Sequence, residues 1–285
     1  MVCPENGAKG IPCVYALLPN KKKQTYEMLF NTIKKQVTKS QNENGDYALN
    51  VQKIVTDFEI GVFSSVQKVF QDVEHKGCKF HHNAAIWKKL GEIGLHSLFY
   101  ENAQFQEFIY MHYALCYVPT VDIVNTYNQV ITPFMEDALT HYEEWEEFSG
   151  EIGQFCYYYC DTYIEKRNGR EALFPPKLWT HYDTVLNDGV ATNNKLESFN
   201  RTWNSIIGFK KNVWHVHEQF VKQESEARRA YLANAVAADL HTNSGRKQKA
   251  LDSLGRLKFV VSAYNTTPIK DYISILAHDL QKFDK

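Results

Sequence analysis

Short apolar runs and helical periods alternate along the first 82 residues. The runs at 11–18, 50–56 and 78–81 have the length and the β-rich composition of strands. Between them, apolar side chains recur every three or four positions at 24–37 and 62–70, as they do on one face of a helix. The order strand-helix-strand-helix-strand, with crossovers of helix length, predicts a three-stranded parallel sheet.

After His82 the pattern is helical for about a hundred residues. Cys156 and Cys160 lie four positions apart, hence on one helix face, and we interpret them as core thiols with metal ligation as the alternative. Near the middle, Glu143, Glu144, Glu146 and Glu147 predict a solvated helix face rather than a DNA contact. The sequence Phe174-Pro175-Pro176 breaks this helical region and marks an internal boundary.

A second helical region follows this boundary. Thr192 or Asn193 can cap a helix whose first turn carries Glu197. Beyond it, the pattern predicts a long helix from Val213 to about Leu240 and two shorter helices near 247–263 and 268–283. The protein is therefore expected to be predominantly helical.

Composition restricts the partners and the compartment. The 285 residues carry 33 acidic and 32 basic side chains, so nucleic-acid binding would depend on local patches. From Arg201 to Lys285 there are 14 Lys and Arg residues against 8 Asp and Glu residues, which makes this end locally basic. Six scattered cysteines favour a reducing compartment. The sequence has no apolar run long enough to span a bilayer, so a soluble protein is expected.

Asp57 is the first candidate for chemistry, because it directly follows the predicted strand at 50–56. A carboxylate at the carboxyl end of a strand lies where open α/β sheets bind their ligands. Many aspartates in this position are helix N-caps instead, and the residues alone leave both interpretations open.

Five segments together resemble one family, the catalytic domain of Mutator-like (MULE) DNA transposases, in the same order and with plausible gaps. They are Ile11–Leu18, Tyr26–Phe30, Thr56–Glu59, Gly77–His81 and Thr192–Ser198. The resemblance implies an RNase H-like fold of the DDE group, in which three carboxylates hold divalent metal ions for DNA strand cleavage and transfer. It also implies that a large helical insertion precedes the last carboxylate.

Residue by residue, the resemblance implies that Asp57 and Glu197 are two of the metal-binding, catalytic carboxylates. It implies Mg²⁺ or Mn²⁺ as the cofactor if the protein is active, because such ions take hard carboxylate oxygens. Cys78 and His81 match the family's Cys-x-x-His pair. Residues three apart on a strand point to opposite faces, so zinc is not expected there. We expect Cys78 to pack inward and His81 to handle DNA, with a structural role as the alternative.

The chain also departs from the family pattern. Nothing in Met1–Gly10 matches the family's first catalytic aspartate, since its one acidic residue, Glu5, lies in a Pro/Gly-flanked segment. Ala191 and Asn200 stand where the family often has arginine and histidine. We therefore expect an N-terminally truncated core that keeps strands 3, 4 and 5 in the order 3-4-5, and a polypeptide that is inactive as written because two carboxylates hold two metal ions poorly.

These expectations divide the chain into four parts: residues 1–95 of the core, a helical insertion at 96–178, a closing helix at 179–212 and a helical basic region at 213–285. DNA, namely transposon ends, is the implied partner, and the nucleus is the implied location. The expected DNA-binding residues are His81, Arg201, Lys210, Lys211, Arg228 and Arg229. Two alternatives stay open: a domesticated transposase-derived protein that binds DNA or protein without catalysis, and a helical scaffold without a nucleic-acid role. A homo-oligomer formed through the helical regions is a further expected partner.

Overall fold

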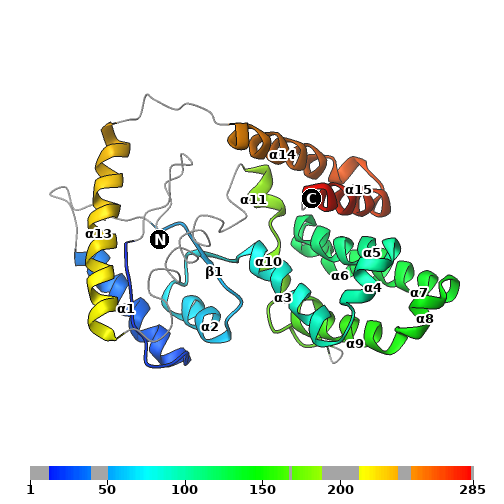
Figure 1. Cartoon of the computed structure of the whole chain (residues 1–285), viewed down its shortest axis with the longest axis horizontal. Helices are drawn as coiled ribbons and strands as arrows, with labels where there is room; N and C mark the ends of the chain where they lie inside the picture. Colours follow the sequence, from blue (N-terminus) through cyan, green and yellow to red (C-terminus); the bar gives the residue numbers. More distant parts are fainter. Residues whose placement is uncertain (1–12, 40–50, 167–168, 188–211, 237–244, 284–285) are drawn as a thin grey trace.

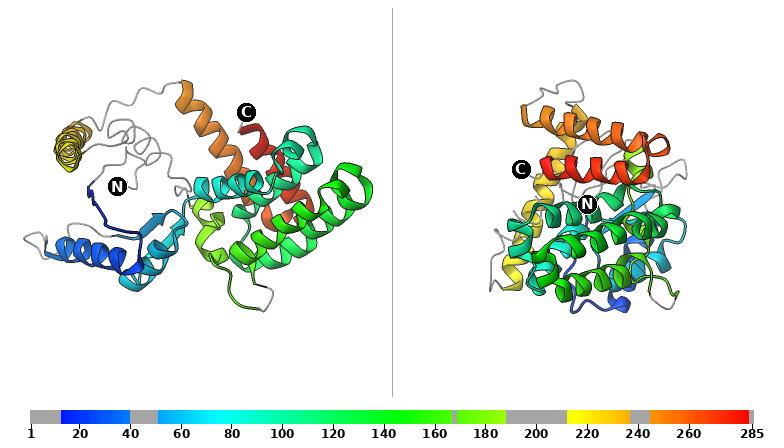
Figure 2. Two further views of the ribbon diagram at one scale, coloured as in Figure 1. Left: turned by 60° about the horizontal axis from the view of Figure 1, so that its bottom comes forward. Right: turned by 90° about the vertical axis from the view of Figure 1, so that its right-hand side faces the viewer.

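The computed structural model describes residues 13–39, 51–166, 169–187, 212–236 and 245–283. It has a small part built on two strands and a larger helical part beside it (Figures 1 and 2). The small part contains α1 (Lys23–Lys39), β1 (Lys53–Thr56), α2 (Ile60–Val69) and β2 (Glu74–Gly77). Within the described ranges no helix is both long and apolar enough to cross a bilayer.

The two strands pair in parallel, with Lys53 opposite Glu74 and Thr56 opposite Gly77. Helix α2 forms the crossover between them, as the hydrophobic period at 62–70 predicts. Helix α1 packs against α2. The parallel pairing, the crossover and the helix expected at 24–37 are therefore confirmed.

The predicted three-stranded sheet is not found in the described residues, where the sheet has two strands. Residues 13–18 of the expected strand 11–18 have no regular secondary structure, and Val14 and Leu17 are exposed. One side chain of this segment, Tyr15, packs instead against Phe220, with the ring centroids 5.0 Å apart. The order 3-4-5 is thus wrong for the described part of the segment.

The strand expected at 78–81 lies earlier in the chain, at Glu74–Gly77. Cys78 is already the N-cap of helix α3 (Lys79–Glu92), and His81 lies in the first turn of that helix. The buried Lys76 of this strand is paired, because its ammonium donates to the carbonyl oxygens of Lys177 and Thr180 at 2.9 Å each.

The helical part begins with α3 and continues to residue 186. Its further elements are α4 (His96–Glu101), α5 (Ala103–Ala114), η1 (Leu115–Tyr117), η2 (Thr120–Asp122), α6 (Ile123–Thr126), the π-helical turn η3 (Tyr127–Ile131), α7 (Thr132–His141), α8 (Glu143–Glu147), α9 (Ser149–Tyr159), the π-helical turn η4 (Cys160–Ile164), α10 (Pro176–Trp179) and α11 (Tyr182–Leu186).

Helix α5 is the centre of the helical part, because it is buried from Phe108 to Ala114 on every face. Aromatic rings surround it, and Trp145 of α8 packs edge-on against Phe105 and Phe108. The four glutamates of α8 are exposed around the buried Trp145, which confirms the solvated acidic face.

The last helices are α13 (Val213–Val236), α14 (Gly245–Ser262) and α15 (Ile269–Phe283), with the short η5 (Tyr264–Thr266) between the last two. Their bounds agree closely with the sequence prediction. Helix α15 covers α5, and Tyr272 donates to the carbonyl of Tyr117 at 2.5 Å. Helix α13 lies at the opposite end of the molecule from α7 and α8 (Figure 1).

Candidate metal and DNA site at the carboxyl edge of the sheet

The carboxyl ends of both strands meet at one edge of the sheet, because the strands are parallel. The amide of Cys78 donates to the carbonyl of Thr56 at 2.8 Å and extends the ladder by one bond. The residues that leave the two strands, 57–59 and 78–81, therefore lie next to each other. This edge is where an open α/β sheet binds its ligands.

Asp57 and His81 form the centre of this edge. The Asp57 Oδ1 atom lies 3.0 Å from His81 Nδ1, and the Asp57 side chain is 55% exposed. His81 reaches this position from the first turn of α3. Asp57 is not the N-cap of α2, since Glu59 occupies that position and makes no side-chain capping bond. The N-cap interpretation of Asp57 is thus wrong.

The second carboxylate of the turn, Glu59, binds the start of the chain. Its Oε1 accepts a hydrogen bond from the Tyr26 hydroxyl at 2.7 Å, and its Oε2 lies 3.3 Å from Lys21 Nζ. Burial and, next, the Glu59 hydrogen bond raise the pKa of Tyr26 to about 12. Glu59 therefore holds α1 near the edge of the sheet, while the Asp57 side chain faces His81.

Phe58 separates these two carboxylates and points the opposite way. Its ring packs edge-on against Tyr163 and Phe174 of the helical part, with centroid distances of 5.8 and 5.2 Å. It also lies directly over Gly77, where an added β-carbon would overlap the ring. A glycine at the end of β2 is therefore required by Phe58, which anchors the turn that carries Asp57.

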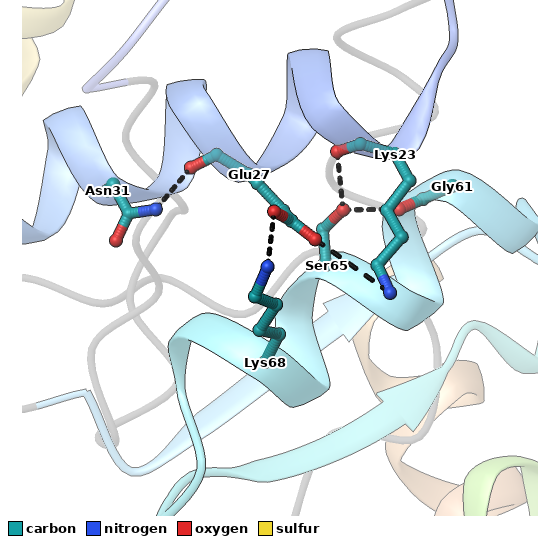
Figure 3. Close-up of polar contacts among 6 residues, drawn as sticks. All are labelled: Lys23, Glu27, Asn31, Gly61, Ser65 and Lys68. Atoms are coloured by element: carbon teal, nitrogen blue, oxygen red, sulfur yellow. Dashed lines mark hydrogen bonds and ion pairs between the residues drawn. The ribbon is translucent and has the colours of Figure 1, made fainter.

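Polar contacts between α1 and α2 support the same turn (Figure 3). The buried Ser65 hydroxyl lies 2.9 Å from the carbonyl of Lys23 and 2.6 Å from that of Gly61. Glu27 of α1 is 2.8 Å from Lys68 Nζ of α2. Since Gly61 has no side chain, the backbone of Lys21 can approach α2 closely. These contacts fix Lys21 and Tyr26 beside Glu59.

Together these residues enclose an open hollow at the edge of the sheet. Its lining consists of Lys21, Asp57, Phe58, Glu59, Ile60, Gly61, His81 and Ala85. The hollow is open to solvent, so a large substrate could reach the exposed Asp57 without entering a closed pocket. The sequence did not identify Lys21, Tyr26 and Glu59 as site residues. The contact between α1 and the turn at 57–59 joins positions more than thirty residues apart, which no local spacing reveals.

The Cys-x-x-His pair lies at a helix start rather than on a strand, which corrects the expected geometry. Cys78 is fully buried, whereas the His81 side chain is 31% exposed and faces Asp57. Cys78 therefore points inward and His81 lies at the edge of the sheet, as expected from the sequence, although the two residues are on a helix start. Among the described residues no group of three or more His, Cys, Asp and Glu side chains could hold a metal ion.

The other expected site residues are not brought to this edge within the described ranges. Arg228 and Arg229 are exposed on α13. Glu197, Arg201, Lys210 and Lys211 lie outside the described residues.

Comparison with known proteins supplies one match. Residues 1–85 match the family model described as the MULE transposase domain, a range that contains both strands, Asp57 and the Cys78–His81 pair. Searches of curated proteins and of solved structures each found no match.

Proposed function

We propose that this chain, whose first 85 residues match the MULE transposase domain, is the catalytic-domain portion of a MULE-type transposase that keeps a DNA and metal site but is inactive as written. Asp57 and Glu197 would bind a divalent metal ion at the DNA phosphodiester. His81 would orient the Asp57 carboxylate and contact a phosphate. The observation that supports this proposal most directly is the Asp57–His81 pair, 3.0 Å apart in an open hollow at the carboxyl edge of parallel strands.

The residues at this edge fit one Mg²⁺ or Mn²⁺ ion better than two. Mg²⁺ keeps several waters and commonly binds through one or two carboxylates together with substrate phosphates. At this edge of the sheet, Asp57 supplies an exposed carboxylate. The carboxylate of Glu59 already accepts a hydrogen bond from Tyr26 and lies 3.3 Å from the Lys21 ammonium. When bound, such an ion would polarise a phosphodiester and activate a water.

Chain length allows Glu197 to reach Asp57. Thr184 of α11 is bound to β1, because Lys53 Nζ donates to its hydroxyl at 2.9 Å. Asn187 is the last described residue before Glu197, ten positions away. Ten residues span at most roughly 35 Å, whereas the four residues of β1 rise about 10 Å. The chain beyond α11 is thus long enough to return to the carboxyl edge.

Localised radical cleavage tests the metal site. Fe²⁺ replaces Mg²⁺ in such sites and, with ascorbate, cuts the polypeptide next to its ligands. We expect cuts close to residues 57 and 197, and their loss in Asp57→Asn. The exposed Asp72→Asn is the matched control and should keep both cuts. Cuts elsewhere that persist in Asp57→Asn would contradict the proposal.

The same polypeptide is expected to show no strand transfer and little Mg²⁺-dependent nicking of supercoiled DNA. Two carboxylates place the second ion of a two-metal mechanism poorly. Robust nicking that Asp57→Ala abolishes would show instead that a further acidic residue completes the site.

DNA contacts are expected on the basic region rather than on α8, whose exposed glutamates repel phosphate. Replacing Arg228 and Arg229 with alanine should weaken DNA binding. It should also make the slope of log affinity against log salt concentration shallower, by the amount expected for the loss of roughly one to two phosphate contacts. Replacing the exposed Lys35 and Lys88 instead removes the same charge outside this region. Equal effects of both double substitutions would mean that binding depends on net charge alone. Binding that is unaffected by salt would favour the scaffold alternative.

A further inference from the structure

A second cavity lies within the helical part, with a lining that shares no residue with the hollow at Asp57. Its volume is about 640 Å³, within the range of small-ligand sites. One wall comes from α6, η3 and α7, and the other from α9, η4 and the residues that follow. Neither wall belongs to the segment that matches the transposase domain.

Both walls contain a π-helical turn. Tyr127, Asn128 and Ile131 of η3 line the cavity on one side, and Cys160, Asp161 and Ile164 of η4 line it on the other. A π-helical turn inserts one residue into a helix and is usually kept where it positions side chains for a function. Here two such turns direct side chains into one cavity.

Three sulfur atoms from these walls line the same cavity. Cys156 and Cys160 come from α9 and η4, and Met135 comes from α7. The Cys156 thiol lies 3.4 Å from the Met135 sulfur. Tyr127 of η3 lines the same cavity as both cysteines. Two thiols and one thioether therefore converge from two helices.

This donor set selects the kind of ion that could bind. Thiolate and thioether sulfurs are soft donors, which prefer Cu(I) and related monovalent d¹⁰ ions. Zinc requires four nitrogen, sulfur or oxygen ligands, and the described residues contain no group of three or more His, Cys, Asp and Glu that could hold a metal ion. Asp161 and Glu165 also line the cavity, against one lysine, Lys166, so the lining favours entry of a cation.

We propose that Cys156, Cys160 and Met135 form a binding site for one soft monovalent metal ion, such as Cu(I) or Ag(I). The ion would be held by the two sulfurs of Cys156 and Cys160, with the Met135 thioether as the third ligand. Binding replaces the thiol protons with the ion and releases them to solvent, so no oxidant or reductant is consumed.

Titration of the reduced chain with Cu(I), in competition with a coloured Cu(I) chelator and without oxygen, tests the proposal. We expect one tightly held equivalent with sulfur-to-copper absorption in the ultraviolet. Cys160→Ser should weaken this binding by at least about a hundredfold, and Met135→Leu, which conserves volume, by about tenfold. Cys13→Ser removes an exposed thiol elsewhere and should leave the affinity unchanged. Unchanged affinity in Cys160→Ser would overturn the proposal.

An experiment without substitutions covers the case in which a variant does not fold. The unmodified chain is treated with a small alkylating reagent, with and without one equivalent of Ag(I), and modified cysteines are identified by mass spectrometry. Protection of Cys156 and Cys160 together is the expected result. Protection of other cysteines, with modification of these two unchanged, would overturn the site. Neither readout depends on DNA cleavage, so the proposal stands or fails separately from the proposed transposase function.

Discussion

At the scale of single residues, three consecutive side chains at 57–59 have three different partners. Asp57 faces His81, Phe58 packs into the aromatic rings of the helical part, and Glu59 binds Tyr26 and Lys21. The Glu59 amide donates to the Asp57 carbonyl at 2.9 Å, so the backbone makes a tight turn centred on Phe58, which permits this division. The exposed Asp57 is thus held in place by its two neighbours.

Gly77→Ala tests the role of Phe58 in this arrangement. The new methyl group would overlap the Phe58 ring, so either the ring or the end of β2 must move. We expect a loss of about 1–3 kcal/mol in the free energy of unfolding, measured by urea denaturation, together with weaker metal-dependent cleavage at residue 57.

Gly150→Ala is the matched control for that substitution. Gly150 lies in α9 and has open space around the position of an added β-carbon. Alanine there should leave the protein equally stable or up to about 1 kcal/mol more stable, because glycine weakens a helix. A similar loss in both variants would mean that Phe58 does not restrict Gly77.

At the scale of elements, one lysine connects the sheet with the helical part. Lys76 extends from β2 and donates to two carbonyls at the start and end of the α10 segment, Lys177 and Thr180. Burial, the main cause, lowers the pKa of the Lys76 ammonium. Lys53 of β1 makes a parallel connection to Thr184 of α11. Both strands are thereby attached to the segment that leads toward Glu197.

Lys76→Met should weaken this attachment. It keeps the aliphatic stem but leaves two carbonyls of the 177–180 segment without their donor, at a cost of about 1–3 kcal/mol in the free energy of unfolding. Hydrogen exchange should accelerate in α10 and α11 more than in α5. Lys88→Met removes an exposed ammonium, 3.7 Å from Glu92, and should cost at most about 1 kcal/mol. Equal losses in the two variants would exclude a special role for Lys76.

At the scale of the whole molecule, buried neutral histidines make the fold sensitive to acid. His82 is fully buried, stacked on Trp179 with centroids 5.1 Å apart, and burial lowers its pKa to about 3. Burial likewise lowers the pKa of His181 to about 3 and that of His112 to about 4. All three lie in or beside the aromatic core of the helical part.

The sign of the pH dependence follows from these directions. In the unfolded chain, histidine binds a proton as the pH falls below about 6.5, whereas the buried rings stay neutral. The stability is therefore fully present above about pH 6.5 and is lost as the pH falls toward 3. Each such histidine contributes a slope of at most about 1.4 kcal/mol per pH unit.

His82→Phe should flatten this profile. Phenylalanine can stack on Trp179 in the same way but cannot bind a proton, so the variant should lose stability less steeply between pH 6 and pH 4. The free energy of unfolding, measured by denaturant at several pH values, checks this. Parallel profiles for the two proteins would mean that His82 is already accessible to protons in the folded state.

Much of the local structure could be predicted from the sequence. The periods that predict helices at 24–37, 247–263 and 268–283 end within a few residues of α1, α14 and α15. The parallel pairing of two strands across a helix and the position of Asp57 after β1 were also predictable. These features depend on side chains a few positions apart, which is the range over which helix and strand periods are defined.

The tertiary structure alone decided which polar residues are buried. The sequence placed the last strand at 78–81, yet β2 is the polar segment Glu74–Gly77, in which the Lys76 ammonium donates to carbonyls 101 and 104 positions away. Ile11–Leu18 looks like a strand, yet its described residues 13–18 are not in the sheet and Tyr15 packs on Phe220, about 200 positions along the chain. The approach of Met135 to Cys156 and the position of Tyr26 beside Glu59 are equally non-local. A strand requires a partner edge and a buried charge requires a donor or acceptor, and only the folded chain decides which distant residues provide them.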